Sequence, residues 1–161
     1  MRLIHTLVPA MIAVAACAPK PKAIDPAKLN AFAADYAAAW SSQNASRVAV
    51  HYSPLGTLSI NGAKAIGRGA VTADAQNFMS AFPDMVVALD SLVVTGEHPV
   101  FYWTLTGTNT GPGGTGKAVR FSGYESWTLG PDGLIALSDG HFDSAEYQRQ
   151  LKEGIAKGAA K

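Results

Sequence analysis

The second half of the chain contains a segment with a strong strand pattern, Val100-Phe101-Tyr102-Trp103-Thr104-Leu105-Thr106-Gly107-Thr108. Apolar and polar side chains alternate along it, as expected for a strand with one buried face. Similar segments flank it at residues 85–94, 118–129 and 134–142, and turns or loops at 97–99, 111–116 and 131–133 separate them. This pattern predicts four antiparallel strands in hairpin order.

The first half of the chain has helical spacing instead. Asp25-Pro26 supplies a capping residue and a proline suited to the first helical position, and the helix is predicted to run to about Gln43. Its apolar residues recur every three or four positions and share one face: Leu29, Phe32, Tyr36 and Trp40. A short helix over 44–52, a strand over 57–60, a turn at 61–62 and a helix over 70–82 are predicted to follow. Helices followed by strands indicate an α+β fold, in which a curved sheet wrapped around the first helix would leave a cone-shaped pocket.

The N-terminus has the features of an export signal. Arg2 precedes an apolar run over residues 3–16, which is shorter than the ~20 residues needed to span a bilayer but fits a signal peptide. Val14-Ala15-Ala16-Cys17 resembles the lipobox of bacterial lipoproteins, which implies cleavage before Cys17 and lipidation of that residue. An ordinary secretory signal that happens to end near a cysteine is the alternative. Ala18 gives no signal for retention in an inner membrane, so a host with two membranes is expected to place the protein in the outer membrane, facing the periplasm.

The predicted domain organisation follows from this start. Residues 1–16 form the signal peptide, and residues 17–27 form a tether rich in proline and lysine that buries nothing. Residues 28–153 form one domain, and residues 154–161 form a flexible tail. Cys17 is the only cysteine, so no disulfide can form within the chain and the core alone must stabilise the domain.

Charge and motifs exclude several classes of function. Without Arg2, the 13 Lys and Arg residues become 12 and balance the 12 Asp and Glu residues, and no basic stripe appears. Nucleic acid is therefore not an expected partner. The glycine-rich segment at 111–116 joins two strands rather than a strand and a helix, so it does not predict a phosphate site. His141-x-Asp143 offers at most two metal ligands, and neither a metal nor a cofactor is expected.

Several motifs, in this order and spacing, resemble the SnoaL-like branch of the NTF2-like superfamily over residues 28–153. They are Trp40, Gly67-Arg68-Gly69, Phe82-Pro83-Asp84-Met85, Gly107-Thr108-Asn109-Thr110-Gly111, Val119-Arg120-Phe121-Ser122-Gly123, Gly140-His141-Phe142-Asp143 and Gln150-Leu151. The resemblance implies a cone-shaped α+β barrel, often dimeric through its sheet. Members of the family include polyketide cyclases that need no metal or cofactor, and others that only bind ligands.

Asp143 and His141 are the candidate catalytic residues. Asp143 lies where the cyclases carry an acidic residue, and a carboxylate facing an apolar cone could move a proton at neutral pH. In a regular strand, positions 141 and 143 point to the same face, so His141 and Asp143 are expected to form an acid/base pair on the pocket wall, with Asp139 on the same face. The alternatives are that Asp143 caps the last helix and that His141 lies at a rim in contact with water.

The resemblance also places a set of residues at the pocket: Trp40, Tyr52, Phe82, Trp103, Asn109 and Tyr124, with Asn109 standing where related sequences carry histidine. Such a surface suits an apolar or aromatic small molecule. Two functions remain open at this point. One is a membrane-anchored envelope domain that binds such a molecule. The other is a cofactor-independent, cyclase- or isomerase-like enzyme using Asp143 and His141.

Overall fold

The computed structural model describes residues 25–95 and 98–156. Within them the chain forms, in order, α1 (Pro26–Ser41), α2 (Ala45–Ala49), β1 (Tyr52–Ile60), β2 (Ala63–Ile66), α3 (Gly67–Ala81), β3 (Val86–Thr95), β4 (His98–Thr108), β5 (Ala118–Leu129), β6 (Ile135–Phe142) and α4 (Ser144–Glu153). The predicted signal peptide, Cys17 and the tether as far as residue 24 lie outside the described residues, as does the tail from residue 157. In the described part, no helix is both long and apolar enough to cross a bilayer.

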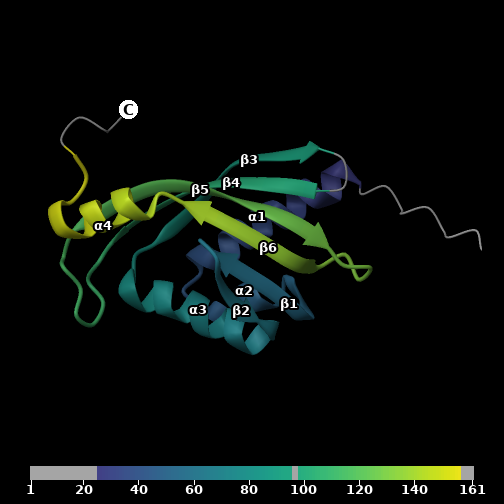
Figure 1. Ribbon diagram of the computed structural model, residues 1–161, viewed down its shortest axis with the longest axis horizontal. Coiled ribbons are helices and arrows are strands. Elements are labelled where there is room, and N and C mark those ends of the chain that lie inside the picture. The colour runs from purple at the N-terminus through teal and green to yellow at the C-terminus, as the bar shows by residue number, and fades with distance from the viewer. Residues whose placement is uncertain (1–24, 96–97, 157–161) are drawn as a thin grey trace, which may run out of the picture.

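The strands form one curved sheet in the order β2-β1-β6-β5-β4-β3 (Figure 1). All neighbouring strands are antiparallel except β1 and β6, which pair in parallel. The α+β class expected from the sequence, with helices packed on a curved sheet, is confirmed. The sheet stays open, with β2 and β3 at its edges, rather than closing into a barrel.

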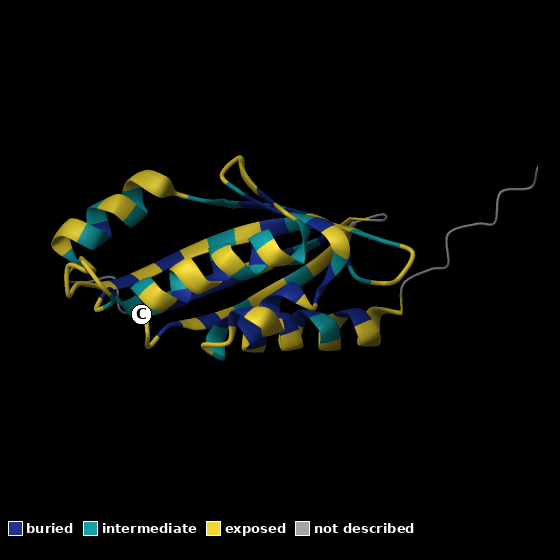
Figure 2. Ribbon diagram, turned by 90° about the horizontal axis from the view of Figure 1, so that it is seen from below, coloured by how far each residue is buried: buried dark blue, intermediate teal, exposed yellow. Residues whose placement is uncertain are grey.

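The helices α1 and α3 enclose the core with the sheet, because α1 packs against β3 and α3 packs against β1. Figure 2 shows the result as buried inner stripes and exposed outer stripes on helices and strands alike. Asp25 caps α1 by accepting a hydrogen bond from the Ala27 amide at 3.0 Å, and Pro26 occupies the first helical position, as predicted. Leu29, Tyr36 and Trp40 of α1 point into the core.

The strand β1 differs from its prediction. It begins at Tyr52 rather than at residue 57, so Pro54 lies inside it instead of ending the preceding element. A register shift between Tyr52 and Thr57 accommodates the proline, which cannot donate a hydrogen bond to a neighbouring strand. The turn at Asn61-Gly62 joins β1 to β2, a short strand that was not predicted, and α3 begins at Gly67 rather than at residue 70.

Candidate functional site

A buried carboxylate, Glu125, lies at the centre of the enclosed space. Alternation along β5 turns Val119, Phe121, Glu125 and Trp127 to the inner face of the sheet, and Glu125 is only 6% exposed. Its Oε2 accepts three hydrogen bonds: from Ser138 Oγ at 2.6 Å, from the Tyr36 hydroxyl at 3.0 Å and from Trp127 Nε1 at 3.0 Å. A buried carboxylate is tolerated only with such partners, and here α1, β5 and β6 each supply one.

The hydrogen-bond chain extends one step further, to Tyr52. The hydroxyl groups of Tyr36 and Tyr52 lie 2.7 Å apart. Since Tyr36 donates its proton to Glu125, Tyr52 donates to Tyr36. Burial, reinforced by the negative charge of Glu125, raises the pKa of both tyrosines well above the ordinary value, so both stay protonated and act as donors.

Burial also raises the pKa of Glu125, against the opposing effect of its hydrogen bonds from Ser138, Trp127 and Tyr36. Oε2 already accepts three hydrogen bonds, so no lone pair is left on it to bind a proton. Oε1 makes no hydrogen bond to the described part of the chain. Any proton that Glu125 binds must therefore sit on Oε1, which makes this oxygen the one able to exchange a proton with a ligand.

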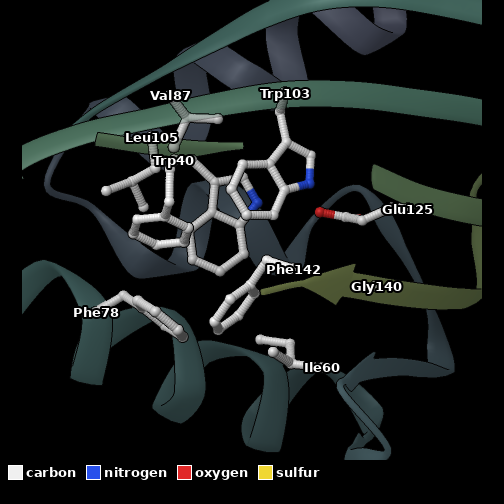
Figure 3. A pocket seen from close by; sticks show the side chains of 10 residues that line it. Trp40, Ile60, Phe78, Val87, Trp103, Leu105, Glu125, Gly140 and Phe142 are labelled. Atoms are coloured by element: carbon white, nitrogen blue, oxygen red, sulfur yellow. The ribbon is translucent and has the colours of Figure 1, made fainter. Parts of the chain in front are cut away.

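An apolar cavity adjoins Glu125 (Figure 3). Its volume is about 40 Å³, and it is open to solvent. The residues that line it are Trp40, Ile60, Phe78, Val87, Trp103, Leu105, Phe121, Glu125, Gly140 and Phe142. Ile60, Phe78 and Phe142 are only partly buried, so they form the mouth. Glu125 is the only ionisable residue in this lining.

Two glycines make room for the cavity side chains. Gly123 lies opposite Trp103 in the β4–β5 register, and a Cβ at this position would lie 2.5 Å from the Trp103 ring. Gly140 lies opposite Glu125 in the β5–β6 register, and its Cβ would lie 3.3 Å from the Glu125 side chain. The missing side chains thus let the Trp103 indole lie across β5 and leave space beside the carboxylate.

Comparison with the sequence patterns of protein families matches residues 33–138 to the SnoaL-like domain, which is more than half of the chain. The chain belongs to the SnoaL-like domain family. A search of curated protein sequences finds no match.

Solved structures support the same fold for this SnoaL-like domain. TsrD from Streptomyces laurentii aligns with a TM-score of 0.70 and 24% identity, covering 80% of this chain and 97% of that one. A protein with a ketosteroid isomerase-like fold from Catenulispora acidiphila DSM 44928, solved with trimethylamine, aligns with a TM-score of 0.67 and 15% identity, covering 74% and 91%. An NTF2-like protein of unknown function from Burkholderia pseudomallei K96243 aligns with a TM-score of 0.65 and 18% identity, covering 76% and 95%. At these identities the likeness concerns the fold.

In this SnoaL-like domain, Asp143 lies outside the cavity. It is the N-cap of α4, where Oδ1 accepts hydrogen bonds from the amides of Ala145 and Glu146, both at 2.9 Å. β6 ends at Phe142, and its inward-facing residues are Ser138, Gly140 and Phe142, so even a longer strand would turn residue 143 to the outer face. Asp143 therefore acts as a helix cap, which is the alternative considered from the sequence. It also lines a shallow depression between β5 and α4, and most residues around that depression are polar.

His141 also lies away from the cavity. Along β6, Ser138 and Gly140 are buried, so His141 turns to the outer face of the sheet, where its side chain is 43% exposed. Its Nε2 lies 3.3 Å from Asp139 Oδ2, and its ring packs on Tyr124 at 5.3 Å. The hydrogen bond from His141 lowers the pKa of the Asp139 carboxyl. The structure thus pairs His141 with Asp139 and does not bring it together with Asp143.

The residues predicted to line the pocket divide into two groups. Trp40 and Trp103 line the cavity. Tyr52 and Phe82 are buried in the core beside it, and Asn109 braces a loop through hydrogen bonds with Ala81 and Thr115. Tyr124 lies on the outer face of the sheet, 41% exposed.

Glu125 is a candidate functional residue that the sequence prediction missed. A signal for it exists in the strand over 118–129, where the alternate positions Val119, Phe121, Glu125 and Trp127 are apolar except for one acid. A lone acid in an apolar row marks either a buried functional group or an error in strand register. No group of three or more metal-ligating side chains occurs in the described residues.

Proposed function

We propose that this SnoaL-like domain binds a small, mainly apolar molecule in the cavity beside Glu125. The observation that supports this most directly is a buried carboxylate that faces an otherwise apolar, aromatic-lined cavity and has one oxygen without a hydrogen bond to the described part of the chain. Ligand sites combine an apolar lining with a few polar groups that fix orientation, and this cavity has that composition. The trimethylamine bound to the structurally similar Catenulispora protein is consistent with a small ligand.

Filling the cavity tests this proposal. Val87 lines the cavity, whereas its neighbour Val86 lies on the opposite face of β3 and is 52% exposed. We expect Val87→Phe to weaken binding of phenol, used as a probe, by about tenfold or more, because the added ring occupies the ligand's space. Val86→Phe, the matched control, should bind phenol like the wild type.

Nuclear magnetic resonance titration of both variants measures this, with circular dichroism to verify that each is folded. Equal phenol affinity in wild type and Val87→Phe would place the binding site elsewhere, and the proposal would fail.

The cellular part of the proposal is a lipid anchor. Cys17 would be lipidated after cleavage of residues 1–16, and the tether up to residue 27 would hold the domain off the membrane in the cell envelope. A domain held there meets ligands of the envelope. In a host with two membranes the expected location is the outer membrane, facing the periplasm.

Replacing Cys17 tests the anchor. Cys17→Ser removes the acceptor thiol, so the protein should lose incorporation of labelled palmitate and move from the membrane fraction to the soluble fraction. The domain itself should keep its circular dichroism spectrum. A Cys17→Ser protein that stays in the membrane fraction would show that the thiol does not anchor it.

A homodimer through the outer face of the sheet is also part of the proposal. Val86, Tyr102 and Tyr124 expose apolar surface on that face, and Tyr102 packs on Tyr124 at 6.0 Å. Light scattering should give twice the monomer mass for the wild type and a reduced mass for Tyr124→Glu. A monomeric wild type would remove this part of the proposal.

A second candidate function is cofactor-independent acid/base catalysis, with Glu125 in the place first assigned to Asp143 and His141. The raised pKa of Glu125 and the unengaged Oε1 favour it. Such an enzyme would exchange deuterium from D₂O into the carbon beside the carbonyl of a bound ketone, and Glu125→Gln would abolish the exchange. Equal exchange by the wild type and Glu125→Gln would exclude this role.

A further inference from the structure

Two indole N–H groups at the cavity, those of Trp40 and Trp103, have no acceptor in the described part of the chain, and the Trp103 nitrogen is the one directed toward Glu125 in Figure 3. Trp103 is buried to 9% exposure, and its Nε1 finds no partner in the described part of the chain. Buried indole N–H groups are normally paired, because leaving one unpaired is unfavourable. The contrast with Trp127 is direct, since the Trp127 indole donates to Glu125 Oε2. A ligand that supplies an acceptor for the Trp103 N–H would therefore be favoured in this cavity.

The unpaired donor lies beside the unengaged acceptor. Figure 3 shows the Trp103 nitrogen and a carboxylate oxygen of Glu125 directed toward the same part of the cavity, and both residues line it. The two groups make no hydrogen bond with each other. A donor and an acceptor thus face one space from β4 and β5, while Val87, Leu105 and Phe142 supply apolar walls around it.

We infer that the ligand of this cavity is an alcohol or phenol whose hydroxyl group binds between Trp103 Nε1 and Glu125 Oε1. This rests on the proposed function and names the chemical class of its ligand. The hydroxyl oxygen accepts from the indole, and the hydroxyl proton is donated to the carboxylate. If Oε1 carries a proton instead, the hydroxyl oxygen accepts from it through its second lone pair.

Other polar groups fit this pair of residues less well. An ammonium group has no acceptor for the indole N–H. A carboxylate would be repelled by ionised Glu125, and a ketone has no proton to donate to it. The hydroxyl group satisfies both residues in either protonation state of Glu125, which is why the geometry favours it.

A comparison of phenol with toluene tests the inference, because the two have similar shapes and differ by a hydroxyl against a methyl group. The full chain with Cys17→Ser is titrated with each, and the indole N–H signals of its three tryptophans are followed by nuclear magnetic resonance. We expect phenol to bind about tenfold more tightly than toluene and to shift the Trp103 indole signal as a new hydrogen bond does.

Two variants refine the test. Trp103→Phe keeps an aromatic ring but removes the N–H, so the preference for phenol should fall to about threefold or less. Phe78→Leu, at the mouth, is the control; it should weaken both probes and preserve their ratio. If toluene binds the wild type as tightly as phenol does, the inference fails while the binding proposal stands. This outcome is read from the wild type alone, so it does not depend on the folding of any variant. If neither probe moves a cavity signal, the proposed function itself fails.

Discussion

Replacing Glu125 by alanine is expected to lower the free energy of unfolding by ~3–5 kcal/mol at neutral pH. The change leaves three buried donors, on Tyr36, Trp127 and Ser138, without their common acceptor. Each unsatisfied buried group costs ~1–3 kcal/mol, and water entering the enlarged cavity offsets part of the total. Urea denaturation measures the difference.

Glu125→Gln is the matched control, since its amide oxygen still accepts from the donors and no charge is buried. We expect it to unfold within ~1 kcal/mol of the wild type near pH 4.5. Burial raises the pKa of Glu125 in the folded state, so the folded protein keeps a proton that the unfolded chain releases near the ordinary value of 4.5. Wild-type stability is therefore complete below that pH and falls as pH rises toward the pKa of the folded state.

The pH series accordingly separates the two proteins. The glutamine variant has no such titration, so its advantage over the wild type should grow from pH 4.5 upward and level off once Glu125 is ionised in the folded protein. A difference that stays constant with pH would mean that burial does not perturb this carboxylate. If the alanine variant is as stable as the glutamine variant, the three buried donors do not need an acceptor at position 125.

Trp127→Ala is expected to cost ~3–5 kcal/mol of unfolding free energy. Trp127 is fully buried and stacks on Phe101 with ring centroids 5.1 Å apart, while the rings of Tyr36 and Phe32 meet it edge-on at 5.3 and 5.8 Å. The substitution removes this packing together with one of the three hydrogen bonds to Glu125. Urea denaturation at pH 7 gives the loss.

Two controls divide the effect of Trp127 into its parts. Trp127→Phe keeps an aromatic ring in the stack but loses the N–H, so a loss of ~1–2 kcal/mol is expected. Thr128→Ala, the next residue on the exposed face of β5, should stay within ~0.5 kcal/mol. If Trp127→Ala were no more destabilised than Thr128→Ala, the aromatic cluster could not be the core that supports the site.

The parts of the fold that depend on neighbouring residues could be predicted from the sequence. The cap of α1 at Asp25-Pro26 and the alternation in β4 and β5 are local, and the structure contains them as expected. The parallel pairing of β1 with β6 joins segments about eighty residues apart, and no periodicity reveals such a partner. The start of β1 was missed because Pro54 reads as a strand breaker in the sequence. The bulge that accommodates this proline forms in the pairing with β6, which the sequence does not reveal.

The site was predictable only in part. Trp103 was placed at the pocket through the family resemblance, whereas the burial of Glu125 could have been inferred from the alternation of β5 alone. Its three donors come from residues 36, 127 and 138, and only the folded chain brings them to one oxygen. His141 and Asp143 were expected to share a face of the last strand that lines the pocket, but the alternation of β6 turns that face outward, and the capping alternative for Asp143 matches its observed contacts.

The central claim is that the cavity beside Glu125, and not the region around Asp143 and His141, binds the ligand. The most direct measurement is the dissociation constant for phenol of the wild type, Val87→Phe and Asp143→Asn, each with Cys17→Ser. We predict that Val87→Phe raises it about tenfold or more, whereas Asp143→Asn leaves it within about twofold because the capping residue lies outside the cavity. The opposite pattern, with binding lost in Asp143→Asn and kept in Val87→Phe, would contradict the account.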